Sequence, residues 1–181
     1  MKQRFGMMFL ALLLALTAIP AMANPAGEIT DKTAKKIRKE LVTLPFYSVF
    51  DNMAFKVEDG IVTLYGQVTR PTLRKDAQRV VERIDGVEQV VNKIEVLPLS
   101  NFDDRIRIAV FRAIYRQPGF DRLAVMAVPP IHIIVKNGNV TLKGVVANEG
   151  EANFANVRAN SVPGVFEVRN ELRVESASRE R

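Results

Sequence analysis

Hydrophobic and polar residues alternate along two pairs of short segments, and a two-residue turn separates the members of each pair. Alternation with a period of two places the apolar side chains on one face of a β-strand. Asp-Gly and Asn-Gly are preferred in two-residue hairpin turns because both positions need positive φ. The sequence therefore predicts two β-hairpins, with strands 54–58 and 61–68 around Asp59-Gly60 and strands 131–136 and 139–146 around Asn137-Gly138.

The two hairpins are copies of one unit. Residues 58–68 match residues 136–146 at a constant offset of 78 positions, and the same offset relates Gly86 to Gly164 beyond the hairpins. Similarity at a fixed period indicates the duplication of one supersecondary unit. We therefore expect two repeats with the same fold.

Apolar residues with helical spacing precede and follow each hairpin, so each repeat reads helix, hairpin, helix, strand. A crossover helix between two strands of one sheet makes those strands parallel. The predicted fold class is therefore α+β, with two tandem αββαβ repeats, each a three-stranded mixed sheet covered on one face by two helices. The expected helices span residues 30–44, 71–85, 103–116 and 149–161, and the final strands span residues 87–97 and 165–174.

The first repeat is expected to occupy residues 30–97 and the second residues 103–175, followed by a polar tail at 176–181 that we expect to be frayed. The linker between the repeats is only a few residues long. Repeats joined so closely are expected to touch rather than to move independently.

The N-terminus has the pattern of a secretory signal peptide. Lys2 and Arg4 precede an apolar run, and small residues end at Ala23, where cleavage is expected. The chain contains no cysteine, so a lipid-modified N-terminal cysteine is excluded. We expect an exported protein that is not a lipoprotein, and the bacterial periplasm fits this pattern best.

The charge balance favours anionic surfaces. Removing residues 1–23 takes away Lys2 and Arg4, and the formal net charge falls from +6 to +4. In a cell envelope the anionic surfaces are phospholipid head groups, lipopolysaccharide and acidic proteins. Nucleic acid fits the charge, but it does not fit an exported location, and it is not an expected partner.

The sequence offers no catalytic or cofactor-binding constellation. His132 is the single histidine and cysteine is absent, which argues against a His/Cys metal site, a Cys-His dyad and a Ser-His-Asp triad. Neither a P-loop nor a dinucleotide-binding fingerprint occurs. We expect no enzymatic activity, no cofactor and no small-molecule substrate, and a structural role for His132 in its apolar strand.

The duplicated motifs resemble those of a known family. Gly followed by Val-Thr-Leu-x-Gly-x-Val (60–68 and 138–146), and Gly-Val-x-x-Val-x-Asn (86–92 and 164–170), recur in order and resemble the BON domain of bacterial osmotically induced and nodulation proteins. The resemblance covers nearly all of the chain after residue 30. It implies an αββαβ fold, no enzymatic activity, and a role at the cell envelope that includes phospholipid interaction or a chaperone-like function.

In tandem lipid-binding members of that family, contact with anionic phospholipid is attributed to the first helix of the second repeat. On a helical wheel, one face of helix 103–116 is apolar and suited to the core, and a second apolar strip lies opposite, flanked by arginines. Such a strip suits an interfacial helix, although it could instead pack against the first repeat. The core-facing residues are Ile106, Ala109, Val110, Ala113 and Ile114, and the candidate binding residues are Arg105, Ile108, Phe111, Arg112, Tyr115 and Arg116.

Two further features of the sequence are a pair of asparagines and a longer segment in the second repeat. Asn92 and Asn170 fall on the inward side of their strands, where a buried amide must find hydrogen-bond partners. The second repeat is longer than the first within residues 120–130, and this apolar segment could be a membrane-dipping loop or a lid over the core.

The sequence thus predicts a non-enzymatic periplasmic protein that associates with anionic phospholipid and supports envelope integrity or a stress response. The alternative is a protein–protein adaptor or chaperone of the envelope that uses the same surfaces on polypeptides.

Overall fold

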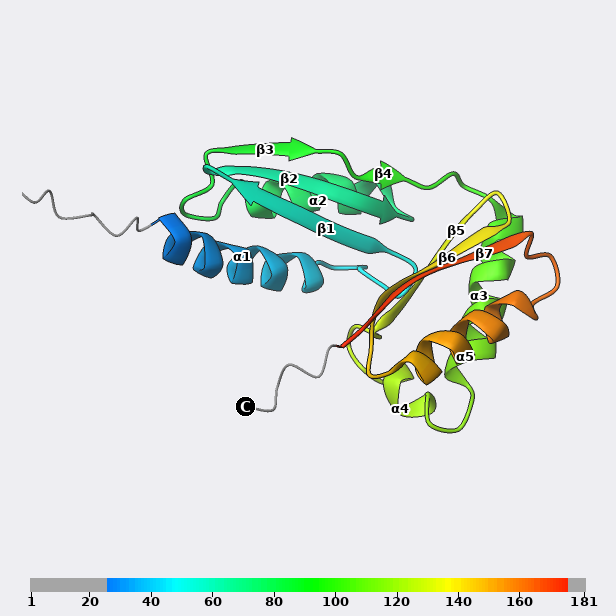
Figure 1. Ribbon diagram of the computed structural model, residues 1–181. Helices are drawn as coiled ribbons and strands as arrows, with labels where there is room; N and C mark the ends of the chain where they lie inside the picture. Colours follow the sequence, from blue (N-terminus) through cyan, green and yellow to red (C-terminus); the bar gives the residue numbers. More distant parts are fainter. Residues whose placement is uncertain (1–25, 176–181) are drawn as a thin grey trace, which may run out of the picture.

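The computed structural model describes residues 26–175, which form two αββαβ repeats and confirm the predicted fold class (Figure 1). The expected signal peptide and the tail lie outside these residues. The first repeat contains α1 (Ala26–Val42), β1 (Asn52–Glu58), β2 (Ile61–Val68), α2 (Pro71–Val81), β3 (Gln89–Asn92) and β4 (Glu95–Val96). The second contains α3 (Asn101–Tyr115), α4 (Asp121–Ala124), β5 (Ile131–Lys136), β6 (Asn139–Val146), α5 (Glu149–Asn160) and β7 (Glu167–Val174).

Each sheet is mixed, as predicted. β1 pairs with β2 in antiparallel register and β2 pairs with β3 in parallel, and β5, β6 and β7 repeat this arrangement. The hairpin turns have the expected positive φ, 46° and 80° at Asp59 and Gly60, and 52° and 77° at Asn137 and Gly138. In each repeat the two long helices lie on one face of the sheet (Figure 1).

The last strand of the first repeat differs from the prediction of one strand over 87–97, because it is divided into β3 and β4. At the break, the Asn92 side chain accepts a hydrogen bond from the Ile94 amide at 3.1 Å and donates one to the Arg74 carbonyl at 2.8 Å. Asn170 occupies the same place in β7 and donates to the Ala152 carbonyl at 3.0 Å. Both amides are therefore satisfied structural groups, as predicted, but Asn92 is half-buried and Asn170 is exposed, so neither is fully buried.

Each repeat has its own hydrophobic core between sheet and helices. In the first repeat the most buried side chains come from α1, β2 and α2, and in the second from α3, β5, β6 and α5. The first core includes Ile37, Leu41, Val62, Leu64, Val68, Leu73, Ala77 and Val81. The second includes Ile106, Val110, Ile114, Ile131, Ile133, Val140, Leu142 and Ala155.

The repeats are in contact, which confirms the expectation from the short linker. Val49, in the segment between α1 and β1, is buried in the core of the second repeat. Its carbonyl accepts a hydrogen bond from the Ile133 amide in β5 at 2.8 Å. Lys136 forms an ion pair with Glu95 across the same junction at 2.6 Å. The first repeat therefore supplies part of the second repeat's packing.

Candidate functional site

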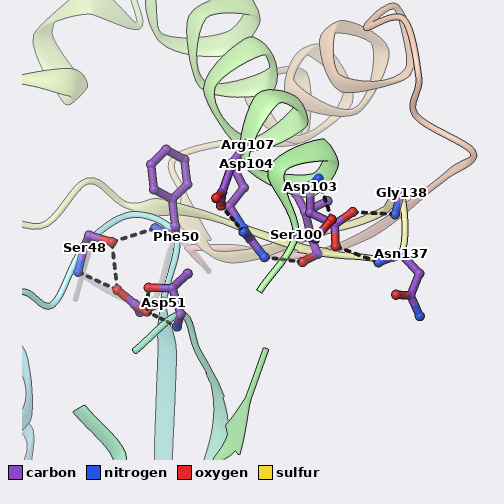
Figure 2. A network of polar contacts seen from close by, with 11 residues as sticks. Ser48, Phe50, Asp51, Ser100, Asp103, Asp104, Arg107, Asn137 and Gly138 are labelled. Carbon is purple, nitrogen blue, oxygen red and sulfur yellow. Dashed lines mark hydrogen bonds and ion pairs between the residues drawn. The ribbon is translucent and has the colours of Figure 1, made fainter. Parts of the chain in front are cut away.

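Helix α3 begins in a network of polar contacts that fixes it against the β5–β6 turn (Figure 2). The Ser100 hydroxyl accepts a hydrogen bond from the Asp103 amide at 3.2 Å and caps the helix. The buried Asp103 carboxylate accepts hydrogen bonds from the amides of Asn137 at 2.9 Å and Gly138 at 2.8 Å. Because three backbone amides are satisfied in this way, the start of α3 has a defined position on the hairpin.

The inner face of α3 is the predicted one. Ile106, Val110 and Ile114 are buried in the core of the second repeat. Ala109 and Ala113 are half-buried and pack at its border. The helical wheel therefore gave the correct core-facing side.

The prediction that Tyr115 is accessible was wrong, because its side chain is only 1% exposed. Its hydroxyl donates a hydrogen bond to the Ile131 carbonyl at 2.8 Å and accepts one from the Ile131 amide at 2.9 Å. Burial raises the pKa of this hydroxyl above its usual value. Tyr115 is the last residue of α3, and its side chain reaches the free edge of β5, where backbone groups need partners. The Tyr115 side chain is therefore not accessible to a membrane surface.

Phe111 is half-buried rather than free. Its ring lies 4.9 Å from the Tyr115 ring and 6.2 Å, edge to face, from Phe50 of the first repeat. Of the two interpretations left open by the sequence, packing against the first repeat is therefore correct for Phe111.

The other four candidates are exposed together. Ile108 is 44% exposed, and Arg105, Arg112 and Arg116 are also at the surface. They occupy the side of α3 opposite Ile106 and Val110, so they point away from the sheet. Among the side chains of residues 31–175, none of these arginines has a carboxylate within 4.0 Å. We call Arg105, Ile108, Arg112 and Arg116 the arginine strip.

Arg107 has a role that the sequence reasoning missed. It is 4% exposed, donates a hydrogen bond from Nη2 to the Val135 carbonyl at 2.6 Å, and pairs through Nη1 with Asp104 (Figure 2). Its position on the helical wheel, beside Ile106 and Val110, was the available signal. Arg107 holds α3 to β5 and does not belong to the exposed strip.

His132 lies at the junction of the repeats and is 9% exposed. Its ring is 5.8 Å from that of Tyr47, and its Nδ1 has no hydrogen-bond partner in the described part of the chain. Burial lowers the pKa of His132 and raises that of Tyr47 to about 12. Both residues border a groove of about 690 Å³ between the repeats. This environment agrees with a structural role for His132.

The longer segment 120–130 closes the core at one end and remains exposed at the other. Phe120 is buried and stacks on Phe154 of α5 with ring centres 4.7 Å apart. Leu123 in α4 packs against the same core. Val125 is 85% exposed and Met126 50%. The lid interpretation is thus correct for Phe120 and Leu123.

Two properties of the described residues bear on function. Across residues 26–175, no group of three or more His, Cys, Asp and Glu side chains is placed to hold a metal ion. In the same part of the chain, no helix is long and apolar enough to cross a bilayer.

Comparison with known proteins places the chain in a family. The BON domain model matches residues 28–98 and again residues 103–176. No curated protein sequence matches the chain. A solved structure of CdsD, a structural protein of the type III secretion system of Chlamydia trachomatis, aligns at 12% identity and a TM-score of 0.31, covering 80% of this chain and 93% of that one. The C-terminal domain of CdsD from the same organism aligns at 12% identity and a TM-score of 0.28, covering 77% and 95%. The two family matches span most of the sequence, and the chain is a member of the BON domain family.

Proposed function

We propose that this protein is a non-enzymatic binding protein of the bacterial periplasm that associates with anionic phospholipid through the arginine strip of α3. Members of the BON domain family are generally non-catalytic and are often linked to phospholipid binding. The observation that carries the proposal is the exposure of three arginines without carboxylate partners around Ile108.

The strip has the chemistry of a helix that lies on a membrane surface. Each arginine near an anionic surface contributes about 1 kcal/mol of attraction, and a single apolar side chain between them can enter the boundary of the acyl region. Phe111 and Tyr115 are engaged in packing. The proposed contact is therefore mainly electrostatic, with Ile108 as its apolar element, and it weakens as salt is added.

Helix α1 provides a comparison surface. It carries five exposed basic residues, but its apolar residues Ile37 and Leu41 are buried. Lys36 pairs with Asp85 at 3.5 Å. The basic residues are Lys32, Lys35, Lys36, Arg38 and Lys39. A membrane contact that required only positive charge would use this face equally well, so α1 supplies the control.

Co-sedimentation of residues 24–181 with vesicles tests the proposal. We expect binding to phosphatidylglycerol-containing vesicles at low salt and none to pure phosphatidylcholine. Arg112→Ala should weaken binding about fivefold, the equivalent of about 1 kcal/mol, and Ile108→Asp should weaken it further. Lys35→Ala on α1 is the matched control and should bind like the wild type.

Three results would overturn the proposal: a wild-type protein that stays in the supernatant at low salt, Arg112→Ala binding as well as wild type, or an equal loss in Lys35→Ala. If the strip variants instead reduce capture of an unfolded outer-membrane polypeptide and leave vesicle binding unchanged, the adaptor or chaperone role replaces the lipid role.

A further inference from the structure

Strand β7 leaves one edge of the second sheet unpaired. Within residues 26–175 it pairs only with β6, and six of its eight residues are exposed. The Glu175 amide donates to Val146 of β6, so backbone groups of odd-numbered residues face β6 and those of Val168, Asn170, Leu172 and Val174 face outward. An exposed edge of this length can pair with another strand unless charge or shape prevents it.

The charges along β7 alternate in sign on the face that the helices do not cover. Glu167, Arg169, Glu171 and Arg173 are all exposed there. A row of one sign would repel a second copy of the strand, whereas this order is symmetric about Asn170 with the signs exchanged. In an antiparallel pair centred on Asn170, Glu167 lies opposite Arg173 and Arg169 lies opposite Glu171 of the other copy. We propose that two copies of this chain associate through β7, edge to edge, in that register.

The register also satisfies the backbone and the apolar side chains. Val168 lies opposite Leu172 at positions whose amide and carbonyl groups face outward, so these groups can exchange hydrogen bonds. The Leu172 amide is now held by the Asn170 side chain at 3.2 Å, and a carbonyl of the second copy would replace that contact. Phe166, 74% exposed before the strand, lies opposite Val174, 39% exposed at its end.

Charge excludes the neighbouring registers. An axis through Arg169 would place Arg169 opposite itself and Glu167 opposite Glu171. An axis through Glu171 would place Glu171 opposite itself and Arg169 opposite Arg173. Like charges directly opposite each other destabilise a strand pair. The register centred on Asn170 is therefore favoured over these two by charge, and it pairs the whole strand, which a register centred on Val168 or Leu172 does not.

Existing ion pairs leave one charge of β7 free. Glu171 pairs with Lys143 of β6, and Arg169 pairs with Glu167 at 3.3 Å. Among the side chains of residues 31–175, Arg173 has no carboxylate within 4.0 Å. Glu167 of the second copy would supply it, and the two-fold symmetry forms this contact twice.

The last strand of the first repeat offers no equivalent edge. It is divided into β3, of four residues, and β4, of two. In the second sheet, the opposite edge at β5 is covered by contacts from Tyr115, Val49 and Arg107. Of these three edges, only β7 presents a continuous strand of eight residues without such contacts among the described residues.

Sedimentation velocity of residues 24–181 at low salt tests the association without any lipid, so its outcome is independent of the proposed function. We expect a monomer–dimer equilibrium. Arg173→Glu places a carboxylate at position 173 opposite the Glu167 carboxylate of the other copy, and this occurs twice per dimer. The substitution should weaken association at least about tenfold. The exchange Glu167→Arg with Arg173→Glu restores opposite charges and should restore the dimer. Lys75→Glu, an exposed change of equal charge on α2, should have no effect.

Because the chain contains no cysteine, disulfide trapping reports the register directly. A mixture of Glu167→Cys and Arg173→Cys proteins should form a linked dimer under mild oxidation, and neither variant alone should do so, because each residue is far from its own copy in this register. A wild-type protein that is monomeric at all concentrations overturns the proposal. So does an Arg173→Glu protein that associates normally, a charge exchange that does not restore the dimer, or equal linking in the single variants and the mixture.

Discussion

The hydroxyl of Tyr115 in α3 both donates a hydrogen bond to the carbonyl of Ile131 and accepts one from its amide, at 2.8 and 2.9 Å. Ile131 opens β5, whose outer edge has no partner strand among the described residues. Farther along that edge, the Ile133 amide bonds to the Val49 carbonyl and the Val135 carbonyl to Arg107. One helix and one segment of the first repeat thus occupy the hydrogen-bonding positions of an edge strand.

Replacement of Tyr115 by phenylalanine should destabilise the protein. The ring would keep its packing, but the buried amide and carbonyl of Ile131 would both lose their partner. An unsatisfied buried polar group costs about 1–3 kcal/mol, so the free energy of unfolding in urea should fall by about that amount. Tyr65→Phe is the control because Tyr65 is 38% exposed, and it should change stability by less than about 0.5 kcal/mol. Equal effects of the two substitutions would contradict the proposed role.

Local patterns predicted most of the fold. Alternation and the Asp59-Gly60 and Asn137-Gly138 turns were sufficient for both hairpins, since those signals act within a few residues. The wheel of α3 was correct for its core face but not for Tyr115. Its orientation depends on the backbone of β5, sixteen residues away in sequence. The helical pattern of α3 alone does not indicate that backbone groups at the edge of β5 require hydrogen-bond partners.

The sequence predicts that the two repeats are in contact, but it does not predict which residues form the contact. The short linker implied that the repeats touch, whereas insertion of Val49 depends on the loop after α1. That loop is held by buried Asp51, whose carboxylate accepts hydrogen bonds from Ser48 and from Thr69. Thr69 lies eighteen residues from Asp51 in sequence, so no local pattern brings these two residues together.

Val49 belongs to the first repeat but packs in the core of the second. Truncation of its side chain should therefore destabilise the second repeat. Val49 is 8% exposed and belongs to the core of the second repeat, so Val49→Ala should cost about 1–2 kcal/mol in the free energy of unfolding. The matched control is Val125→Ala, because Val125 is 85% exposed and should be insensitive. Hydrogen exchange should show faster exchange of the Ile133 amide in Val49→Ala. Unchanged exchange there would contradict the contact.

Gly144 should not tolerate a side chain. It has φ of +129°, and a Cβ atom there would lie 1.9 Å from the Pro130 carbonyl oxygen across the hairpin. Gly119 also has positive φ, +89°, but no atom lies within 4 Å of its Cβ position. Both alanine substitutions carry backbone strain of about 1–3 kcal/mol, and only Gly144→Ala adds the clash. Chemical denaturation should show a loss at least about 2 kcal/mol larger for Gly144→Ala. A similar loss at both sites would contradict the close approach.

Acidification should weaken the protein through His132. Burial holds the pKa of His132 below its usual value despite the opposing effect of Asp51, so the unfolded chain takes up this proton first as the pH falls. The free energy of unfolding should be highest above about pH 6.5 and should decrease below it, by at most about 1.4 kcal/mol per pH unit from this group. Arg38 and Arg173 border the same groove as His132.

Urea denaturation between pH 7.5 and 5.5 measures this slope above the range in which most carboxylates titrate. His132→Gln removes the titrating group, and its stability should vary less with pH than that of the wild type, whatever its absolute stability. Because His132 packs against Tyr47 of the first repeat, the protection factor of the Ile133 amide, which corrects for the pH dependence of intrinsic exchange, should also be lower in the acid form. A wild-type slope equal to that of His132→Gln would show that His132 keeps an ordinary pKa in the folded protein.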